Sequence, residues 1–290
     1  MEDQLMKTIK SYIKQLMEKF SEHNVTLLAA GQAYYYLLSI FPLLIVAFAI
    51  IPYLNLDVNQ VMGTVEKSLP SGMAEIFEDN IVSLIETPKG GLLTIGIIGA
   101  LWSASNGVNA FIKSANSAYG VEETRSFIVV RAMALGLTIG LIIALGVAIT
   151  LPIFGNTIVK YLDMILSLGS SKTILIQILR WAISIIVLTG ILLMFYRFAP
   201  NKNLPFKDTL PGALVASIAW LLISFGFSFY IDNFGNYSAT YGSLGGIIIL
   251  MMWFFLTGII LMVGALINVI YQQNQQKTDE AKDMKKSREA

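Results

Sequence analysis

The sequence predicts an all-α polytopic membrane protein with six transmembrane helices, and three observations support this fold class. The mean hydropathy is +0.67, and 55% of the 290 residues are apolar. Only 13% of the residues are charged, against roughly 25% in ordinary soluble domains. Six apolar stretches are each long enough to cross a bilayer as a helix. A soluble fold is therefore excluded.

The elements follow one another in a simple order. Residues 1–26 place apolar side chains and lysines on opposite helix faces, which predicts an amphipathic helix on the cytoplasmic membrane surface. The spans are expected at about 27–54, 91–113, 128–153, 174–198, 209–231 and 245–271, forming one membrane domain over 27–271. Residues 56–89 are expected to form a loop on the outer side of the membrane that contains two short amphipathic helices. Residues 272–290 are polar and charged, which predicts a disordered cytoplasmic tail.

The distribution of Lys and Arg predicts the orientation. Under the six-span assignment, 15 of the 20 Lys and Arg, Arg131 among them, fall on the side of the two termini. Cytoplasmic loops of membrane proteins carry the excess of positive charge. Both termini are therefore expected in the cytoplasm.

The second predicted span is polar in its second half. Trp102, Asn106, Asn109, Lys113 and Asn116 follow at steps of 4, 3, 4 and 3, which places them on one helix face. We call these five residues the polar stripe. An unsatisfied amide in hydrocarbon costs several kcal/mol, so the stripe is expected to face other helices or a wet cavity. Two interpretations stay open, a substrate path and interhelical hydrogen bonding.

Other spans supply candidate partners for the stripe. Gln32, Tyr35 and Ser39 share one face of the first span and are expected to lie near the stripe. Arg180 is the only charge well inside a predicted span, and Arg197 ends the same span. Arg180 either extends to lipid phosphates or belongs to a site for an anionic head group.

The composition argues against several classes of activity. With no cysteine, the chain has no disulfide, thiolate metal site or Cys nucleophile. His23 is the single histidine, and Glu122 and Glu123, as sequence neighbours, would point apart on a helix. A net charge of +1 provides no basic surface for RNA. No enzyme activity, metal, cofactor or nucleic-acid partner is expected, and ribonuclease activity in particular is disfavoured.

Four separated blocks resemble one family. They are AYYYLLSIFPLL at 33–44, LWSASNGVNAFIKSANSAYGVEETRSF at 101–127, YRFAPN at 196–201 with LPGA at 210–213, and NFGNYSATYGSLGG at 233–246. Their order and spacing resemble the YihY/BrkB family of bacterial membrane proteins. The resemblance implies a six-span protein of the bacterial cytoplasmic membrane whose biochemical activity is not settled. It also implies two inherited labels, a virulence or serum-resistance factor and a "ribonuclease BN".

One block departs from the family pattern. Where the family usually has Gly-Ala-Glu-x-Asn near the end of the last span, this chain has Leu266 in place of the acid, within Gly264-Ala265-Leu266-Ile267-Asn268. No role that rests on the carboxylate, such as proton coupling, can be carried over to this chain.

Two functions compete. The first is a transporter or flippase for a lipid or another amphiphilic, anionic substrate. Its path would be lined by Gln32, Tyr35, Ser39, Trp102, Asn106, Asn109 and Lys113, with Arg180 and Arg197 as further cations. The second is a non-transporting envelope scaffold, in which the same groups only join helices. Membrane lipids are the expected partners, and a homo-oligomer is left open.

Overall fold

The described part of the protein is helical throughout its regular structure. The computed structural model describes residues 2–50, 90–144, 172–234 and 244–289. Its helices are α1 (Glu2–Glu22), α2 (Val25–Ile50), α5 (Gly90–Tyr119), the helix Phe127–Ala144, α7 (Lys172–Phe198), α8 (Phe206–Phe234) and α10 (Leu244–Glu289). The all-α fold class is confirmed.

The hydropathy of these helices identifies an integral membrane protein. Within the described ranges, three segments are long and apolar enough to cross a membrane: Phe127–Ala144, Phe206–Ile231 and Gly245–Glu280. Shorter apolar helical segments cover Val25–Ile40 and Ala182–Phe198. The number of six spans remains a prediction. The predicted outer loop 56–89 and the ends of the first and third predicted spans lie outside the described residues.

The C-terminal segment differs from the sequence expectation. Instead of a disordered tail from residue 272, α10 continues as one helix to Glu289. Residues 272–289 contain no Gly or Pro and are rich in Gln, Lys and Glu, which favour helix. Extending an existing helix also avoids the unfavourable nucleation step. High polarity alone therefore did not imply disorder here.

Helix α10 is the element on which the others assemble. It contacts α8, α2, α5 and α1. A Cβ added at Gly258 would lie 3.0 Å from Ala29 Cα in α2, so the two backbones touch there. A Cβ at Gly264 would overlap Tyr196 Oη of α7, and one at Gly212 of α8 would overlap the Gly264 carbonyl oxygen. Small residues permit this close approach of helices in a membrane protein.

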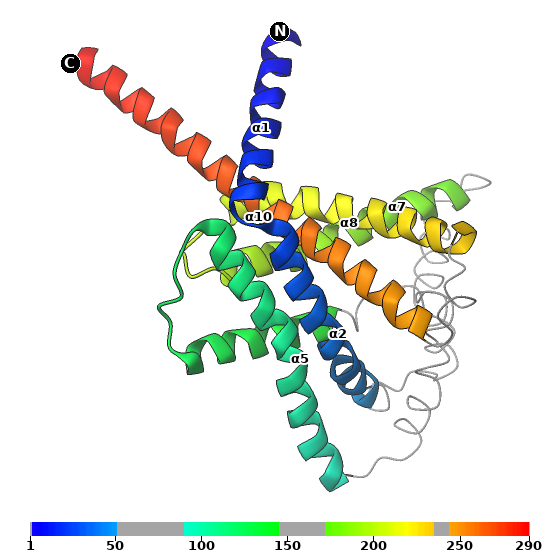
Figure 1. The fold of residues 1–290 in the computed structure, drawn as a ribbon. Coiled ribbons are helices and arrows are strands. Elements are labelled where there is room, and N and C mark those ends of the chain that lie inside the picture. The colour runs from blue at the N-terminus through cyan, green and yellow to red at the C-terminus, as the bar shows by residue number, and fades with distance from the viewer. Residues whose placement is uncertain (1, 51–89, 145–171, 235–243, 290) are drawn as a thin grey trace.

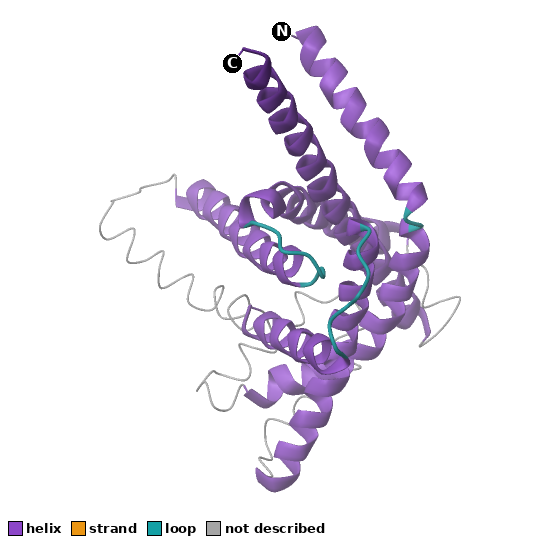
Figure 2. Ribbon diagram, turned by 90° about the vertical axis from the view of Figure 1, so that its left-hand side faces the viewer, coloured by secondary structure: helices purple, strands orange, loops and turns teal. Residues whose placement is uncertain are grey.

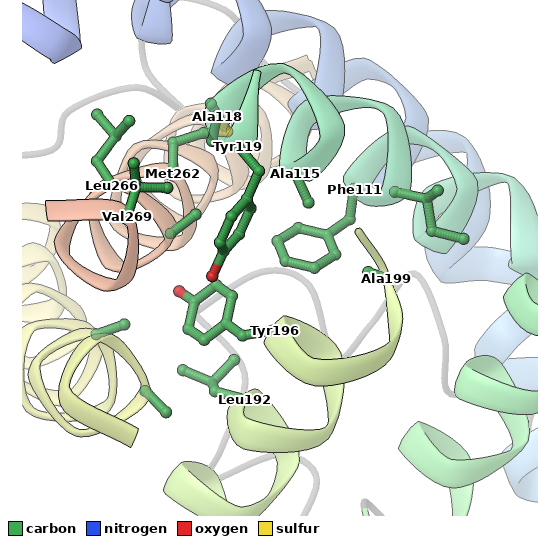
Figure 3. Close-up of a cluster of buried hydrophobic side chains, with 14 of the residues drawn as sticks. Phe111, Ala115, Ala118, Tyr119, Leu192, Tyr196, Ala199, Met262, Leu266 and Val269 are labelled. Atoms are coloured by element: carbon green, nitrogen blue, oxygen red, sulfur yellow. The ribbon is translucent and has the colours of Figure 1, made fainter. Parts of the chain in front are cut away.

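The apolar core fills the space between α5, α7, α8 and α10 (Figure 3). The Phe111 and Tyr196 rings lie 6.0 Å apart, and the Tyr196 hydroxyl donates a hydrogen bond of 2.8 Å to the Leu261 carbonyl. Leu266, at the position where the family pattern has Glu, is fully buried in this cluster. Asn268 of the same block accepts a hydrogen bond of 2.7 Å from the Gly212 amide, which fastens α8 to α10.

Both ends of the chain extend from the helical body on the same side (Figures 1 and 2). Helix α1 ends in a turn at Asn24, whose φ of 48° lies in the left-handed region that asparagine tolerates. Met6, Ile13 and Met17 of α1 are exposed. The predicted position of this helix on the membrane surface stays a prediction.

Candidate functional site on α5

Helix α2 packs against the small-residue face of α5. The Gly107 amide donates a hydrogen bond of 2.8 Å to Ser39 Oγ, and Ser39 Oγ lies 3.4 Å from the Ser103 carbonyl. A Cβ at Gly107 would lie 3.2 Å from Tyr36 Cδ1, so only glycine fits here without displacement. Ser39 thus meets α5 one residue after Trp102 and one after Asn106, on a face of Ser and Gly that allows closer helix contact than the polar stripe itself.

The polar face predicted on α2 is divided between core and surface. Gln32 is buried, and its Oε1 accepts a hydrogen bond of 2.7 Å from the Tyr36 hydroxyl. Its Nε2 is buried without a hydrogen-bond partner among the described residues. Ser39 is also buried, whereas Tyr35 is exposed. Gln32 and Ser39 therefore point into the protein, and Tyr35 does not.

The polar stripe lies on the side of α5 away from this contact. Trp102 is 48% exposed, Asn106 and Asn109 are half-buried, and Lys113 is exposed. Asn116, at the end of the stripe, is buried. From Trp102 to Lys113 the stripe is thus partly open, and the helix that meets it is Phe127–Ala144.

Arg131 makes this second contact. Its Nη1 donates a hydrogen bond of 2.9 Å to Asn106 Oδ1, and its Nη2 donates to the Trp102 carbonyl. Its Cζ lies 3.7 Å from the centroid of the Trp102 ring, a cation–π geometry. The side chain is only 8% exposed, and Nε has no hydrogen-bond partner in the part of the chain that the structure describes. The ion pairs Lys14–Glu18 and Arg125–Glu123 do not involve Arg131, and its hydrogen-bond partners among the described residues are uncharged.

The position of Arg131 along α5 corrects the sequence interpretation. Its partner Asn106 lies 13 residues before Tyr119, the last residue of α5, which corresponds to about 20 Å of helix. The loop after α5 runs back along that helix before the next one begins (Figure 2). Arg131 therefore lies beside the middle of α5 rather than at its end. Since residues 120–126 can span about 23 Å when extended, the sequence permitted this return.

A polar junction closes the end of α5. Asn116 Nδ2 donates a hydrogen bond of 2.8 Å to Glu123 Oε2, and Arg125 binds the same carboxylate through Nε at 2.7 Å and Nη2 at 2.6 Å. The Arg125 guanidinium, followed by the Asn116 amide, holds the pKa of Glu123 below its ordinary value despite partial burial. Glu123 is therefore an anchoring group rather than half of an acid–base pair.

The junction also fastens the next pair of helices. The Asn201 amide N–H donates to Asn116 Oδ1 at 2.7 Å, and Asn201 Nδ2 donates to the Glu122 carbonyl at 2.8 Å. Arg125 Nη2 donates to the Ala199 carbonyl at 2.9 Å. The loop after α5 and the loop after α7 are thus joined by side chains that the sequence interpretation had not grouped. These side chains belong to two of the sequence blocks that resemble the family, 101–127 and 196–201, and this shared membership could have indicated that the two loops lie together.

The remaining candidate cations do not join this site. Arg197 Nη2 donates to Asn203 Oδ1 at 2.8 Å, and its Cζ lies 5.7 Å from the Phe206 ring, at the turn between α7 and α8. Arg180 belongs to α7, but its side chain lies outside the described residues. Across the described ranges, no group of three or more His, Asp and Glu could hold a metal ion.

Comparison with known proteins decides the family. The family model described as Virulence factor BrkB matches residues 16–289. The chain belongs to the BrkB family. The resemblance found in the sequence blocks is therefore confirmed, and it covers the candidate site as well as the helices around it.

Relatives share most of their length with this member of the BrkB family. YfkH of Bacillus subtilis (strain 168), whose name describes it as ribonuclease-like, is 40% identical over 270 residues, which cover 93% of this chain and 98% of YfkH. A UPF0761 membrane protein of Photobacterium profundum is 28% identical over 284 residues, covering 94% and 84%. One of Vibrio vulnificus (strain YJ016) is 25% identical over 260 residues, covering 88% and 80%. No solved structure matches.

Proposed function

We propose that this protein transports an amphiphilic, anionic substrate of lipid type across the bacterial cytoplasmic membrane. The head group would move along the polar stripe of α5 while the apolar part stays in the lipid. The observation that carries the proposal is the partial exposure of the stripe from Trp102 to Lys113 on a helix whose opposite face is buried. Amide groups at membrane depth need polar partners or water, and a passing head group supplies them.

The proposal includes an orientation. Six spans with both termini in the cytoplasm place Lys113 and the junction near the inner surface, because Lys and Arg concentrate on that side. Moving Arg131 away from that surface changes the count of 15 by one and leaves the sign of the asymmetry unchanged. Lys113 would attract the head group from the inner leaflet, and Arg180 would do so near the outer one. Arg197 would add positive charge near the inner end.

The chain is treated as non-enzymatic in this proposal. Phosphodiester cleavage is disfavoured because the chain has one histidine and no cysteine to act as acid, base or nucleophile. RNA binding is disfavoured because the net charge is only +1. The ribonuclease-like name belongs to YfkH. A cofactor, a metal ion and a nucleic-acid partner have no role in the proposed transport.

A scaffold function is the second candidate. It is favoured by the contact of α8 with α10, where Gly212, Gly264 and Asn268 bring the backbones together with little room for movement. A scaffold would use the polar stripe only to join helices. It would support the envelope without moving any substrate.

Reconstitution into liposomes separates the two functions. Fluorescent phosphatidylglycerol is placed in both leaflets, and an impermeant reductant then measures how fast inner-leaflet lipid reaches the outside. We expect wild-type protein to accelerate this exchange and Asn106→Leu with Asn109→Leu to slow it at least tenfold at equal protein content. Asn274→Leu, the same replacement in the projecting part of α10, is the control. Exchange no faster than in protein-free liposomes would refute transport of this lipid class.

Charge at the two ends of the proposed path gives a cellular test. Lys113→Gln and Arg180→Gln remove one charge each while keeping hydrogen-bond donors. A transporter should then lose activity at a normal protein level, whereas a structural role should lower the protein level first. Full complementation of a deletion strain by both variants at normal levels would exclude the charged path.

A further inference from the structure

We infer that Arg131, with Trp102 and Asn106, forms a binding site for the phosphate group of an anionic amphiphile. This inference rests on the proposed function in one respect, since the ligand is the head group that follows the polar stripe. The site itself is argued from the hydrogen bonds, burial and charge of the three residues.

Arg131 carries a positive charge that no described residue neutralises. Arg131 is 8% exposed and contacts α5 at Asn106, about 20 Å of helix before that helix ends. An ionisable side chain in a membrane helix is rare, and it pairs with another charge or with backbone carbonyls, or lines a substrate route. Its hydrogen-bond partners are an amide oxygen and a backbone carbonyl, both uncharged. Among the described residues Arg131 thus has no anionic partner, and the phosphate group of a ligand would supply one.

Arg131 also has hydrogen-bond donors that no described residue accepts from. A guanidinium has five N–H groups in one plane. Asn106 Oδ1 accepts a hydrogen bond from Nη1 and the Trp102 carbonyl accepts one from Nη2, whereas Nε is buried with no partner among the described residues. The Nε N–H and the N–H groups left on Nη match the spacing of two phosphate oxygens. A lysine at this position could not offer such a fork.

Trp102 lies against the face of the Arg131 guanidinium. Its ring lies 3.7 Å from the Arg131 Cζ and is itself 48% exposed, so it covers the cation on the open side of the stripe. The ring partly compensates the charge in the absence of a ligand. A phosphate bound in the plane of the guanidinium would lie beside the indole ring, so binding would change the surroundings of Trp102.

A purely structural role makes a different prediction. An Arg that only joins two helices through Asn106 and the Trp102 carbonyl could be replaced by Gln, whose NH₂ group supplies two donors. Such a role needs no positive charge. Charge and hydrogen bonding can therefore be tested separately.

The experiment measures binding rather than transport. Purified protein in neutral detergent is titrated with short-chain phosphatidylglycerol while Trp fluorescence is followed, and the part of the signal lost in Trp102→Phe reports on the site. We expect saturable binding that weakens at least tenfold in Arg131→Gln. Lys202→Gln removes one charge from an exposed side chain whose Nζ donates a hydrogen bond of 2.9 Å to Gln272 Oε1, and this variant should bind as wild type. Unchanged binding in Arg131→Gln would overturn the inference.

A second variant guards against misfolding of the first. Asn106→Asp places a carboxylate on Arg131 with little change in shape, so it should abolish lipid binding while thermal stability is kept or raised. Asn274→Asp is the matched control, because it adds the same charge away from the stripe. Full binding in a stable Asn106→Asp protein would also overturn the inference.

Two further comparisons complete the test. Competition by inorganic phosphate would assign the site to free phosphate, whereas binding of phosphatidylglycerol without such competition assigns it to a lipid head group. Both results support the phosphate site. If wild type binds lipid but does not move it in liposomes, the transport proposal fails and the site stands. If it moves lipid while Arg131→Gln still binds it normally, the site fails and transport stands.

Discussion

Replacing Glu123 by alanine should destabilise the protein by opening the junction between the two loops. The Glu123 carboxylate accepts four hydrogen bonds, from Asn116 Nδ2, from Arg125 Nε and Nη2, and from the Arg125 backbone amide at 3.1 Å. The carboxylate is 31% exposed, so the ion pair with Arg125 contributes only about 0–1 kcal/mol after solvent screening. The larger loss of stability comes from Asn116, whose buried side-chain amide loses its acceptor.

Asn116 is 6% exposed, and a buried donor that loses its acceptor costs about 1–3 kcal/mol. We therefore expect the free energy of unfolding to fall by about 2–3 kcal/mol in Glu123→Ala, measured in mild detergent by denaturant titration. Glu122→Ala is the control, because Glu122 joins the junction through its backbone carbonyl and its side chain is exposed. Equal unfolding free energies for the two variants would refute the reasoning.

The same site predicts a dependence on pH. Arg125 holds the pKa of Glu123 below its ordinary value, so the folded state binds the proton less readily than the unfolded state. The stabilisation is therefore complete above the unfolded pKa of about 4.3 and is lost as the pH falls through the lower folded value. The stability difference between wild type and Glu123→Gln should shrink as the pH is lowered from about 5 through this window. A difference that stays constant over that range would contradict the assignment.

Two other predictions concern packing and orientation. Gly264→Ala should destabilise the protein by about 1–3 kcal/mol because its Cβ would overlap buried atoms. Gly136→Ala is the control and should leave the stability unchanged, because nothing lies within 4 Å of its Cβ position. Equal thermal stability of the two variants would contradict the close contact at Gly264. Cysteines introduced at Ser71 and Ser238 should react with an impermeant thiol reagent applied to intact cells, and one at Ser287 should not. Labelling at Ser287 from outside would invert the proposed topology.

The helices were largely predictable because hydropathy acts over windows of about 20 residues. α7 and α8 begin within a few residues of the expected positions. The end of α10 was not predictable from polarity, since the same Gln, Lys and Glu residues suit a solvated coil and a solvated helix. Continuity with a stable helix decided between them.

The site was predictable only in part. Spacing alone identified the polar stripe, because helical periodicity determines which residues share a face. The partner of the polar stripe, Arg131, was not identified, because the polar residues of the first span were expected to lie beside the stripe. In the structure α2 packs on the face of α5 around Gly107. Arg131 was assigned to the inner surface because a charge beside a predicted span boundary ordinarily marks that surface. The position of Arg131 along α5 depends on the direction that the loop 120–126 takes, and a loop has no sequence periodicity from which its direction can be predicted.

The length of α10 has a mechanical consequence. Beyond Gly264, where α7 and α8 touch it, the helix continues for 25 residues to Glu289, which is about 38 Å of rigid rod. A tilt of about 10° around that contact would displace the far end by about 6–7 Å. Helix α1 contacts α10 and extends on the same side (Figure 1). The distance between spin labels at Met6 in α1 and Met284 in α10 should therefore change measurably when the membrane helices rearrange by a small amount.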